Sequence, residues 1–416
     1  MGGLLAAALL LGPLLIGRFG DSVIERQLDR LAASSDMLAV TRDAGRSGWF
    51  SSETVHRIIV TDDAAVDLLR RALGGAPFAD QPAVIVATAR YHGPLPAGGG
   101  PGLQRTVSTL ALDTGDGNRI ELPGQLTTAV GFDGRMGAVL TLQEVTTTLA
   151  GGGRLDFAGA DATMTGSLTA GKRDTEARFA GLALSSATGS LDVGRLTLTQ
   201  SKQQTDHPAI FVGDGRFAWD GFSWTPADGT PVGIEDAQLT TRSELTDGAL
   251  DIDVEAVADR VQTEVGERSF RAHLALAGLD PAAASDLVVM VQNGDGDLTQ
   301  LDPAGRERLL DIGERLAAGG ARLRLDKLEI GTPDGLLRAA VSAGFEPGRE
   351  VSGWTGLMRV LSGEAMVEAP AALLGNPVYG WLHGVRSFFE TDDGTARLKL
   401  EIDAGTVTVN GVAVQG

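Results

Sequence analysis

The stretch from Leu250 to Val254 reads LDIDV, while Leu191–Thr199 reads LDVGRLTLT and Thr106–Leu112 reads TVSTLAL. In all three, apolar residues alternate with Thr, Ser or Asp, which is the pattern of an antiparallel strand with one buried face. The same rhythm runs from about Ala83 to Leu279, and turns rich in Gly and Asp, such as Gly213-Asp214-Gly215, separate its segments. The sequence therefore predicts long antiparallel sheets.

Two short segments interrupt this rhythm and predict helices. Asp280-Pro281 and Asp302-Pro303 each place a capping Asp before a Pro that suits the first position of a helix. The helices are expected over residues 283–291 and 305–318. The second has an apolar stripe that would pack against a sheet.

The rest of the chain completes the predicted fold class. Strands are expected to resume at residues 321–330 and 336–345 and to finish the chain at 396–402 and 406–414, with a less regular helical region at 371–383 between them. The expected class is α+β and β-rich: an N-terminal single membrane helix, then extended antiparallel sheets packed on a few helices. A change of pattern near Leu279 predicts a β-rich region over residues 21–279 and an α+β region over 280–416.

Residues 1–17 read MGGLLAAALLLGPLLIG and contain no charged side chain. The run is at the lower limit for a helix that crosses a bilayer, and no small-x-small cleavage site follows it. We expect an uncleaved signal anchor over residues 1–20; a cleaved signal peptide and a buried helix are the alternatives. The residues expected to contact lipid are Leu4, Leu5, Leu9, Leu10, Leu11, Leu14, Leu15 and Ile16.

The orientation of this anchor is ambiguous from the residues alone. Arg18, Arg26 and Arg30 follow the apolar run and no basic residue precedes it, which by the positive-inside rule favours a cytoplasmic location for the bulk of the chain.

Composition excludes several classes of protein. The 416 residues include 35 Lys plus Arg against 54 Asp plus Glu, so the formal net charge is −19. This charge argues against nucleic acid as a partner, because that function needs clustered cations. The chain has no cysteine, which excludes disulfides, thiolate metal sites and a cysteine nucleophile. The 57 glycines are explained mainly by turns between strands.

No motif for catalysis or cofactor binding stands out. The five histidines are scattered, with no HxH or HExxH pair, and the chain has no GxSxG elbow and no phosphate-binding loop. Asn293–Asp297 begins like a calcium loop, but Leu298 and Ala304 stand where that loop needs Gly and Glu. We therefore predict no catalytic residue, no metal ligand, no cofactor and no enzymatic activity.

Four short motifs, in order along the chain, resemble elements of the YdgA-like family of bacterial envelope proteins of unknown function. They are Arg46–Ser52 (RSGWFSS), His92–Pro96 (HGPLP), the turn in Leu325–Gly335 and the closing hairpin Gly405–Gly411 (GTVTVNG). Ser47 departs from the family pattern, which has Arg before Gly-Trp-Phe. The motif residues, expected to be structural, are Gly48, Trp49, Phe50, Ser51, His92, Gly93, Pro94, Asn410 and Gly411.

Each motif has a simple structural interpretation. Trp49 and Phe50 would seat the linker on the first sheet, His92 would be exposed or capping in a turn, and Asn410-Gly411 would form a type I′ hairpin turn. The resemblance itself implies a Gram-negative protein anchored in the inner membrane with its bulk in the periplasm. It implies no enzymatic activity.

Three functions are compatible with these observations. The first is a non-catalytic envelope protein that binds lipid or another apolar ligand in a β-sheet groove, because the few predicted helices cannot cover so many strands. The second is a periplasmic scaffold or regulatory protein that binds a membrane partner. The third, an envelope hydrolase, would need two carboxylates in one cleft.

Overall fold

The structure is a computed structural model that describes residues 38–61, 78–93, 102–115, 119–149, 152–167, 169–207, 209–227, 229–263, 266–292, 302–348, 351–375 and 386–414. The chain divides into two units. Unit 1 contains residues 1–200 and 220–232, and unit 2 contains residues 201–219 and 233–416.

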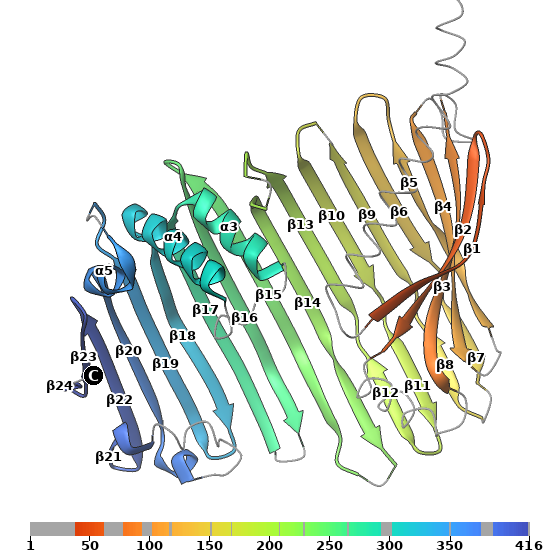
Figure 1. The fold of residues 1–416 in the computed structure, drawn as a ribbon. Helices are drawn as coiled ribbons and strands as arrows, with labels where there is room; N and C mark the ends of the chain where they lie inside the picture. Colours follow the sequence, from red (N-terminus) through yellow and green to blue (C-terminus); the bar gives the residue numbers. More distant parts are fainter. Residues whose placement is uncertain are drawn as a thin grey trace, which may run out of the picture. The chain divides into compact units, whose positions relative to one another are not determined.

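Unit 1 is an antiparallel sheet whose first six strands form a meander, in which each strand pairs with its neighbour along the chain (Figure 1). Alternating apolar residues and Gly-rich turns produce this arrangement, as predicted. Its strands are β1 (Leu38–Ser47), β2 (Ser51–Val60), β3 (Phe78–His92), β4 (Gln104–Gly115), β5 (Arg119–Val130), β6 (Arg135–Leu142), β7 (Val145–Thr148), β8 (Arg154–Phe157), β9 (Ala160–Ser167), β10 (Lys172–Phe179), β11 (Leu182–Ser186) and β12 (Gly189–Val193). Strands β13 (Leu196–Gln204) and β14 (Phe211–Pro226) contribute residues to both units.

A line of glycines bends several strands of unit 1 at the same level. β6 pairs with β9, and β7 pairs with β8, so these four strands form one long hairpin with two interrupted arms. The first arm is interrupted between residues 142 and 145, and the second between residues 157 and 160. Ala180 N donates to Gly159 O and Ala158 N to Gly181 O, both at 2.9 Å, across this level. We call this line the glycine crease; its positive-φ members are Gly124, Gly159, Gly181 and Gly221.

The main core of unit 1 lies on the β7–β8–β11–β12 side of the crease. Phe157, Leu184 and Trp224 are buried there, and the Phe157 and Phe179 rings lie 5.9 Å apart. Leu112 of β4 and Leu122 of β5 pack against this cluster, so the strands on this side of the crease share one apolar core with the wider sheet.

Unit 2 contains a second antiparallel meander, and helices inserted between its strands lie on one of its faces (Figure 1). Its strands are β15 (Val232–Thr246), β16 (Ala249–Thr263), β17 (Gly266–Leu279), β18 (Arg322–Thr332), β19 (Gly335–Phe345), β20 (Leu361–Pro370), β21 (Glu390–Asp392), β22 (Thr395–Asp403), β23 (Thr406–Val409) and β24 (Val412–Val414). Its helices are α3 (Pro281–Gln292), α4 (Pro303–Gly319), α5 (Gly353–Val360) and the 3₁₀ turn η1 (Ala371–Gly375).

The two helices predicted from Asp-Pro pairs are confirmed. The Asp280 side chain accepts a hydrogen bond from Ala283 N at 2.7 Å, and the Asp302 side chain accepts one from Gly305 N at 2.6 Å. Helix α4 packs on β17 and β19 and contacts α3 and α5. The predicted β-rich, antiparallel class with helices packed on a sheet is thus confirmed for the described residues.

Some predictions differ from the structure or fall outside it. Helix α5 and strand β20 were not predicted, and only residues 371–375 of the helical region predicted at 371–383 are described, as a 3₁₀ turn. The predicted anchor over residues 1–20 lies outside the described residues, and within those residues no helix is long and apolar enough to cross a membrane. The boundary at Leu279 stays a prediction; Leu279 ends β17, directly before α3.

Candidate functional site

The first two family-like motifs meet at one end of the sheet in unit 1. Trp49 and Phe50 are the two central residues of the β1–β2 turn, which Gly48 N closes by donating to Ser51 O at 2.8 Å. His92 N donates to Phe50 O at 2.9 Å, so the end of β3 holds the turn in place. Gly93 N then bonds to Leu103 O at 3.2 Å. Pro94 lies outside the described residues.

Two expectations for these motifs are wrong. Trp49 and Phe50 do not seat a linker on the sheet: they are 53% and 55% exposed, because a two-residue turn points its side chains away from the strands. Of the two alternatives expected for His92, exposed or capping, the exposed one is wrong, because only 3% of His92 is exposed. Burial lowers the pKa of His92, and the nearby carbonyl groups of Trp49 and Gly48 oppose that shift.

A cluster of buried polar side chains extends from His92 across β2, β3 and β4. Register places Ser52 opposite Arg90 and Arg90 opposite Thr106, and places Thr88 opposite Ser108. The Thr88 and Ser108 hydroxyl oxygens share a hydrogen bond of 2.9 Å. Arg90 is 2% exposed, and burial lowers its pKa. The buried polar residues of this cluster are Ser52, Thr54, His56, Arg90, His92, Thr106 and Ser108.

The closing motif belongs to unit 2, whereas the first two motifs belong to unit 1. Asn410 and Gly411, with φ of 48° and 77°, form the β23–β24 turn, which agrees with the predicted hairpin dipeptide. The Asn410 side chain also accepts from Lys399 N and donates to Phe388 O, both at 2.8 Å. It therefore ties three segments together.

The sheet of unit 2 has one apolar face, which the register of its strands defines residue by residue. One row crosses seven neighbouring strands, from β16 to β23, without a polar side chain. We call it the apolar row: Val254, Leu274, Leu325, Val341, Ala365, Leu400 and Val409. Parallel rows above and below it contain Leu276, Leu323 and Ile402, and Ala272, Leu328 and Val367.

Helical segments cover this face at its two ends. At one end, Ala317 of α4 and Leu357 of α5 belong to a buried cluster, and Phe345 packs against it. At the other end, Leu373 and Leu374 of η1 pack with Leu337 and Ala396. All seven residues of the apolar row are only half-buried. An apolar band therefore runs across the middle of the face, between the helices and η1.

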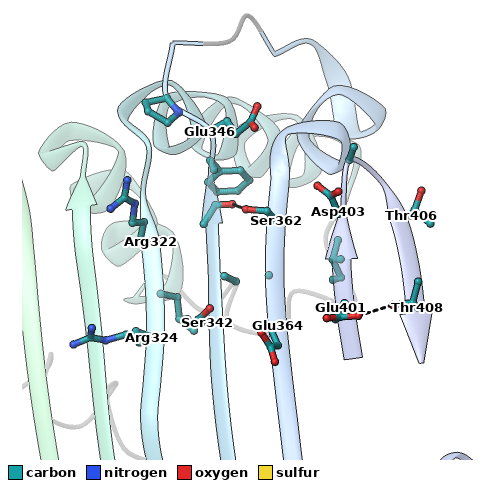
Figure 2. A pocket seen from close by; sticks show the side chains of 18 residues that line it. Arg322, Arg324, Ser342, Glu346, Ser362, Glu364, Glu401, Asp403, Thr406 and Thr408 are labelled. Atoms are coloured by element: carbon teal, nitrogen blue, oxygen red, sulfur yellow. Dashed lines mark hydrogen bonds between the residues drawn. The ribbon is translucent and has the colours of Figure 1, made fainter. Parts of the chain in front are cut away.

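The opposite face of the same sheet is charged and carries an open trough of about 1100 Å³ (Figure 2). Arg322 and Arg324 of β18 line one side, and Glu364 of β20 with Glu401 of β22 the other. Ser342 and Ser362 lie between them, and Thr408 donates to Glu401 at 3.3 Å.

The carboxylates of this trough are already paired with a cation. Lys399 Nζ lies 2.7 Å from Glu401 Oε1 and 3.4 Å from Glu364 Oε1. The Lys399 ammonium lowers the pKa of Glu401, and the two carboxylates raise the pKa of Lys399. A general acid needs a raised carboxyl pKa, so this pair favours a solvated ionic surface over acid–base chemistry.

The structure brings together two of the four predicted motifs and reveals an apolar row of which the motifs contain only Leu325 and Val409. No group of three His, Asp or Glu side chains within the described ranges could hold a metal ion. The apolar row could not be read from any single motif, although the alternation in each strand was the signal for its apolar face. The predicted lipid-contacting residues of the anchor lie outside the described residues.

Comparison with known proteins gives one match. Residues 2–377 match the family model of bacterial proteins of unknown function DUF945. No curated protein and no solved structure matches the chain. The YdgA-like resemblance of the motifs is compatible with this family. Because the match covers most of the chain, the protein belongs to the DUF945 family of bacterial proteins of unknown function.

Proposed function

We propose that this chain is a non-catalytic binding protein of the bacterial cell envelope, anchored in the inner membrane with its bulk in the periplasm, and that the apolar band of unit 2 holds the acyl chains of a lipid. The observation that supports it is the apolar row, which crosses seven strands with every side chain half-buried.

The dimensions of the row suit an acyl chain. Seven strands at a spacing of about 4.8 Å span about 29 Å, whereas one leaflet of a bilayer has a hydrocarbon layer of about 15 Å. Each buried methylene would contribute about 0.8 kcal/mol. A lipid tail laid across the strands would therefore gain affinity along its whole length.

The distribution of charged side chains also supports lipid binding on the apolar face. The paired side chains of unit 2, including Lys399 with Glu401 and Arg397 with Glu368, lie on the opposite face. With a net charge of −19, the chain would gain nothing from general electrostatic attraction to anionic lipid. Lipid would have to be held through apolar contact.

Native mass spectrometry of the full chain, released from detergent, tests the proposal with two neighbouring residues of β19. Val341→Glu places a charge in the apolar row, and Ala340→Glu places the same charge on the opposite face. Phospholipid adducts are expected on the wild type and Ala340→Glu and lost from Val341→Glu. Val341→Thr keeps the shape of the side chain, so it tests the same position if Val341→Glu fails to fold. It should weaken the adducts. Equal adducts on all four proteins would overturn the proposal.

A further inference from the structure

The end of unit 1 that carries the first two motifs presents three large aromatic side chains to solvent. Trp49 and Phe50 form the tip of the β1–β2 turn, and Phe132 lies in the β5–β6 turn; the last is 58% exposed. We call these three residues the aromatic rim.

Backbone hydrogen bonds hold the two turns at the same level. His92 N bonds to Phe50 O, Gly93 N to Leu103 O, and Leu103 N to Val130 O, the last at 2.8 Å. The chain of bonds therefore runs from the first turn to the residue two places before Phe132. Both turns lie at the same end of the unit 1 strands (Figure 1).

These residue types are unusual for such positions. Two-residue hairpin turns favour Asn, Asp and Gly, which suit the backbone and remain solvated. Here the two central positions are Trp and Phe, and a buried His92 braces them. Because polar residues would suit these turn positions better, the exposed aromatic side chains call for an explanation other than turning the chain.

We propose that the aromatic rim inserts into the interfacial layer of a lipid bilayer and seats this end of unit 1 on the membrane. Trp and other aromatic rings favour the level of the lipid headgroups, where one part of the ring is apolar and another is wet. Separate rings on turn tips fit a fluid surface, whereas protein partners need broad and complementary patches.

Local charge permits this contact. The exposed cations beside the turns are Arg46 and Arg135, and the exposed carboxylates are Glu53 and Asp133. Arg135 Nε lies 3.3 Å from Asp133 Oδ2. The rim is thus flanked by balanced charges in a chain whose net charge is −19, and an anionic bilayer would not repel this end.

The chain between the apolar run and the rim is long enough for both to reach the same bilayer. This step rests on the proposed membrane anchor. Strand β1 has ten residues and leads to the rim, a length of about 33 Å. Residues 18–37 could reach about 70 Å if extended. The apolar run of the proposed anchor and the rim can therefore contact the same bilayer.

A site-specific fluorophore tests the proposal, because the chain has no cysteine of its own. Full-length chain carrying Phe132→Cys or Ser47→Cys is labelled with an environment-sensitive dye and reconstituted into vesicles of phosphatidylethanolamine and phosphatidylglycerol. The matched control is Ser190→Cys, an exposed residue of β12 beyond the glycine crease. Vesicles should raise the emission of both rim labels several-fold and protect them from aqueous iodide, and should leave the control label unchanged.

A second set of variants shows whether the aromatic rings are responsible. Adding Trp49→Ser, Phe50→Ser and Phe132→Ser to the Ser47→Cys chain should return its label to an aqueous environment. Adding Phe211→Ser and Phe388→Ser, two aromatic residues of unit 2 that are also exposed, should not.

Flotation of the same vesicles separates the two proposals. If the chain floats but the rim labels stay accessible to iodide, the rim proposal is wrong and the anchor stands. If the chain does not float, both are wrong. Labels that stay accessible in lipid vesicles but are protected in native membranes would indicate a protein partner and would also overturn the proposal.

Discussion

His273 on β17 lies between two carboxylates of the neighbouring strands: its Nε2 is 2.8 Å from Asp253 Oδ2, and its Nδ1 is 3.3 Å from Asp326 Oδ2. The hydrogen bond to Asp253 is the largest cause that raises the pKa of His273, and the charges of Asp326 and Glu255 add to it. The protonated ring can donate to both carboxylates at once, so it links three strands on the charged face of unit 2.

The first prediction concerns the pH dependence of this link. A raised folded-state pKa contributes stability that is fully present below the unfolded value of about 6.5 and is lost as pH rises through the folded value. His273→Gln should therefore lower the melting temperature at about pH 5.5 and change it little at about pH 9. The loss should stay within about 1 kcal/mol, because the pair is partly exposed.

His207→Gln is the control for this measurement, since no ion pair within the described ranges involves the His207 ring. At about pH 5.5 the loss in His273→Gln should exceed the loss in His207→Gln, because only the first variant removes the link between the three strands. A His273→Gln effect that grows with rising pH would contradict the assignment.

The second prediction concerns the glycine crease. A Cβ at Gly124, where φ is +132°, would lie 1.9 Å from Thr141 O, so Gly124→Ala must move backbone. We expect the backbone strain alone to lower the free energy of unfolding by about 1–3 kcal/mol. Gly137→Ala on β6 is the control: its Cβ would meet nothing closer than Met164 O at 3.8 Å. In urea unfolding, Gly137→Ala should leave the free energy of unfolding unchanged or raise it by up to about 1 kcal/mol.

Local sequence patterns predict much of the fold, but some elements have no local signal and could not be predicted. Asp302 and Pro303 predict the start of α4 because a cap acts within one turn. Helix α5 has no such signal: Ser352 makes no side-chain cap hydrogen bond, and α5 begins at Gly353, whose φ is +71°. The crease was also missed, because a glycine that bends a strand looks in sequence like one that ends it.

The candidate surfaces depend on register, which the sequence does not contain. The alternation in β18 and β19 predicts that Leu325 and Val341 share a face with other apolar residues of their own strands. That they lie opposite each other depends on a register shift between Leu325 and Leu328. The contact of His92 with the Trp49 turn likewise joins segments about forty residues apart.

The third prediction concerns Asn410. Asn410→Ala removes two side-chain hydrogen bonds and leaves a residue with φ of +48° that Ala adopts unwillingly. Asn410→Gly removes the bonds but accepts the φ, so its loss of stability should be smaller, on the order of 1–2 kcal/mol. Hydrogen exchange should accelerate in β22–β24 in both variants, and more in the Ala variant. Equal exchange in the two would show that the φ contributes nothing.

The fourth prediction concerns the helix that covers one end of the apolar face. Asp302→Ala leaves Gly305 N without its side-chain acceptor and should cost about 1 kcal/mol, whereas Asp302→Asn should keep most of the cap. Glu307→Ala, an exposed substitution on the same helix, should stay within about 0.5 kcal/mol. Because α4 packs on β17 and β19, hydrogen exchange in Asp302→Ala should rise in α4 and then in the strand ends beneath it. Exchange confined to the first turn would mean that α4 keeps its packing on the sheet without its cap.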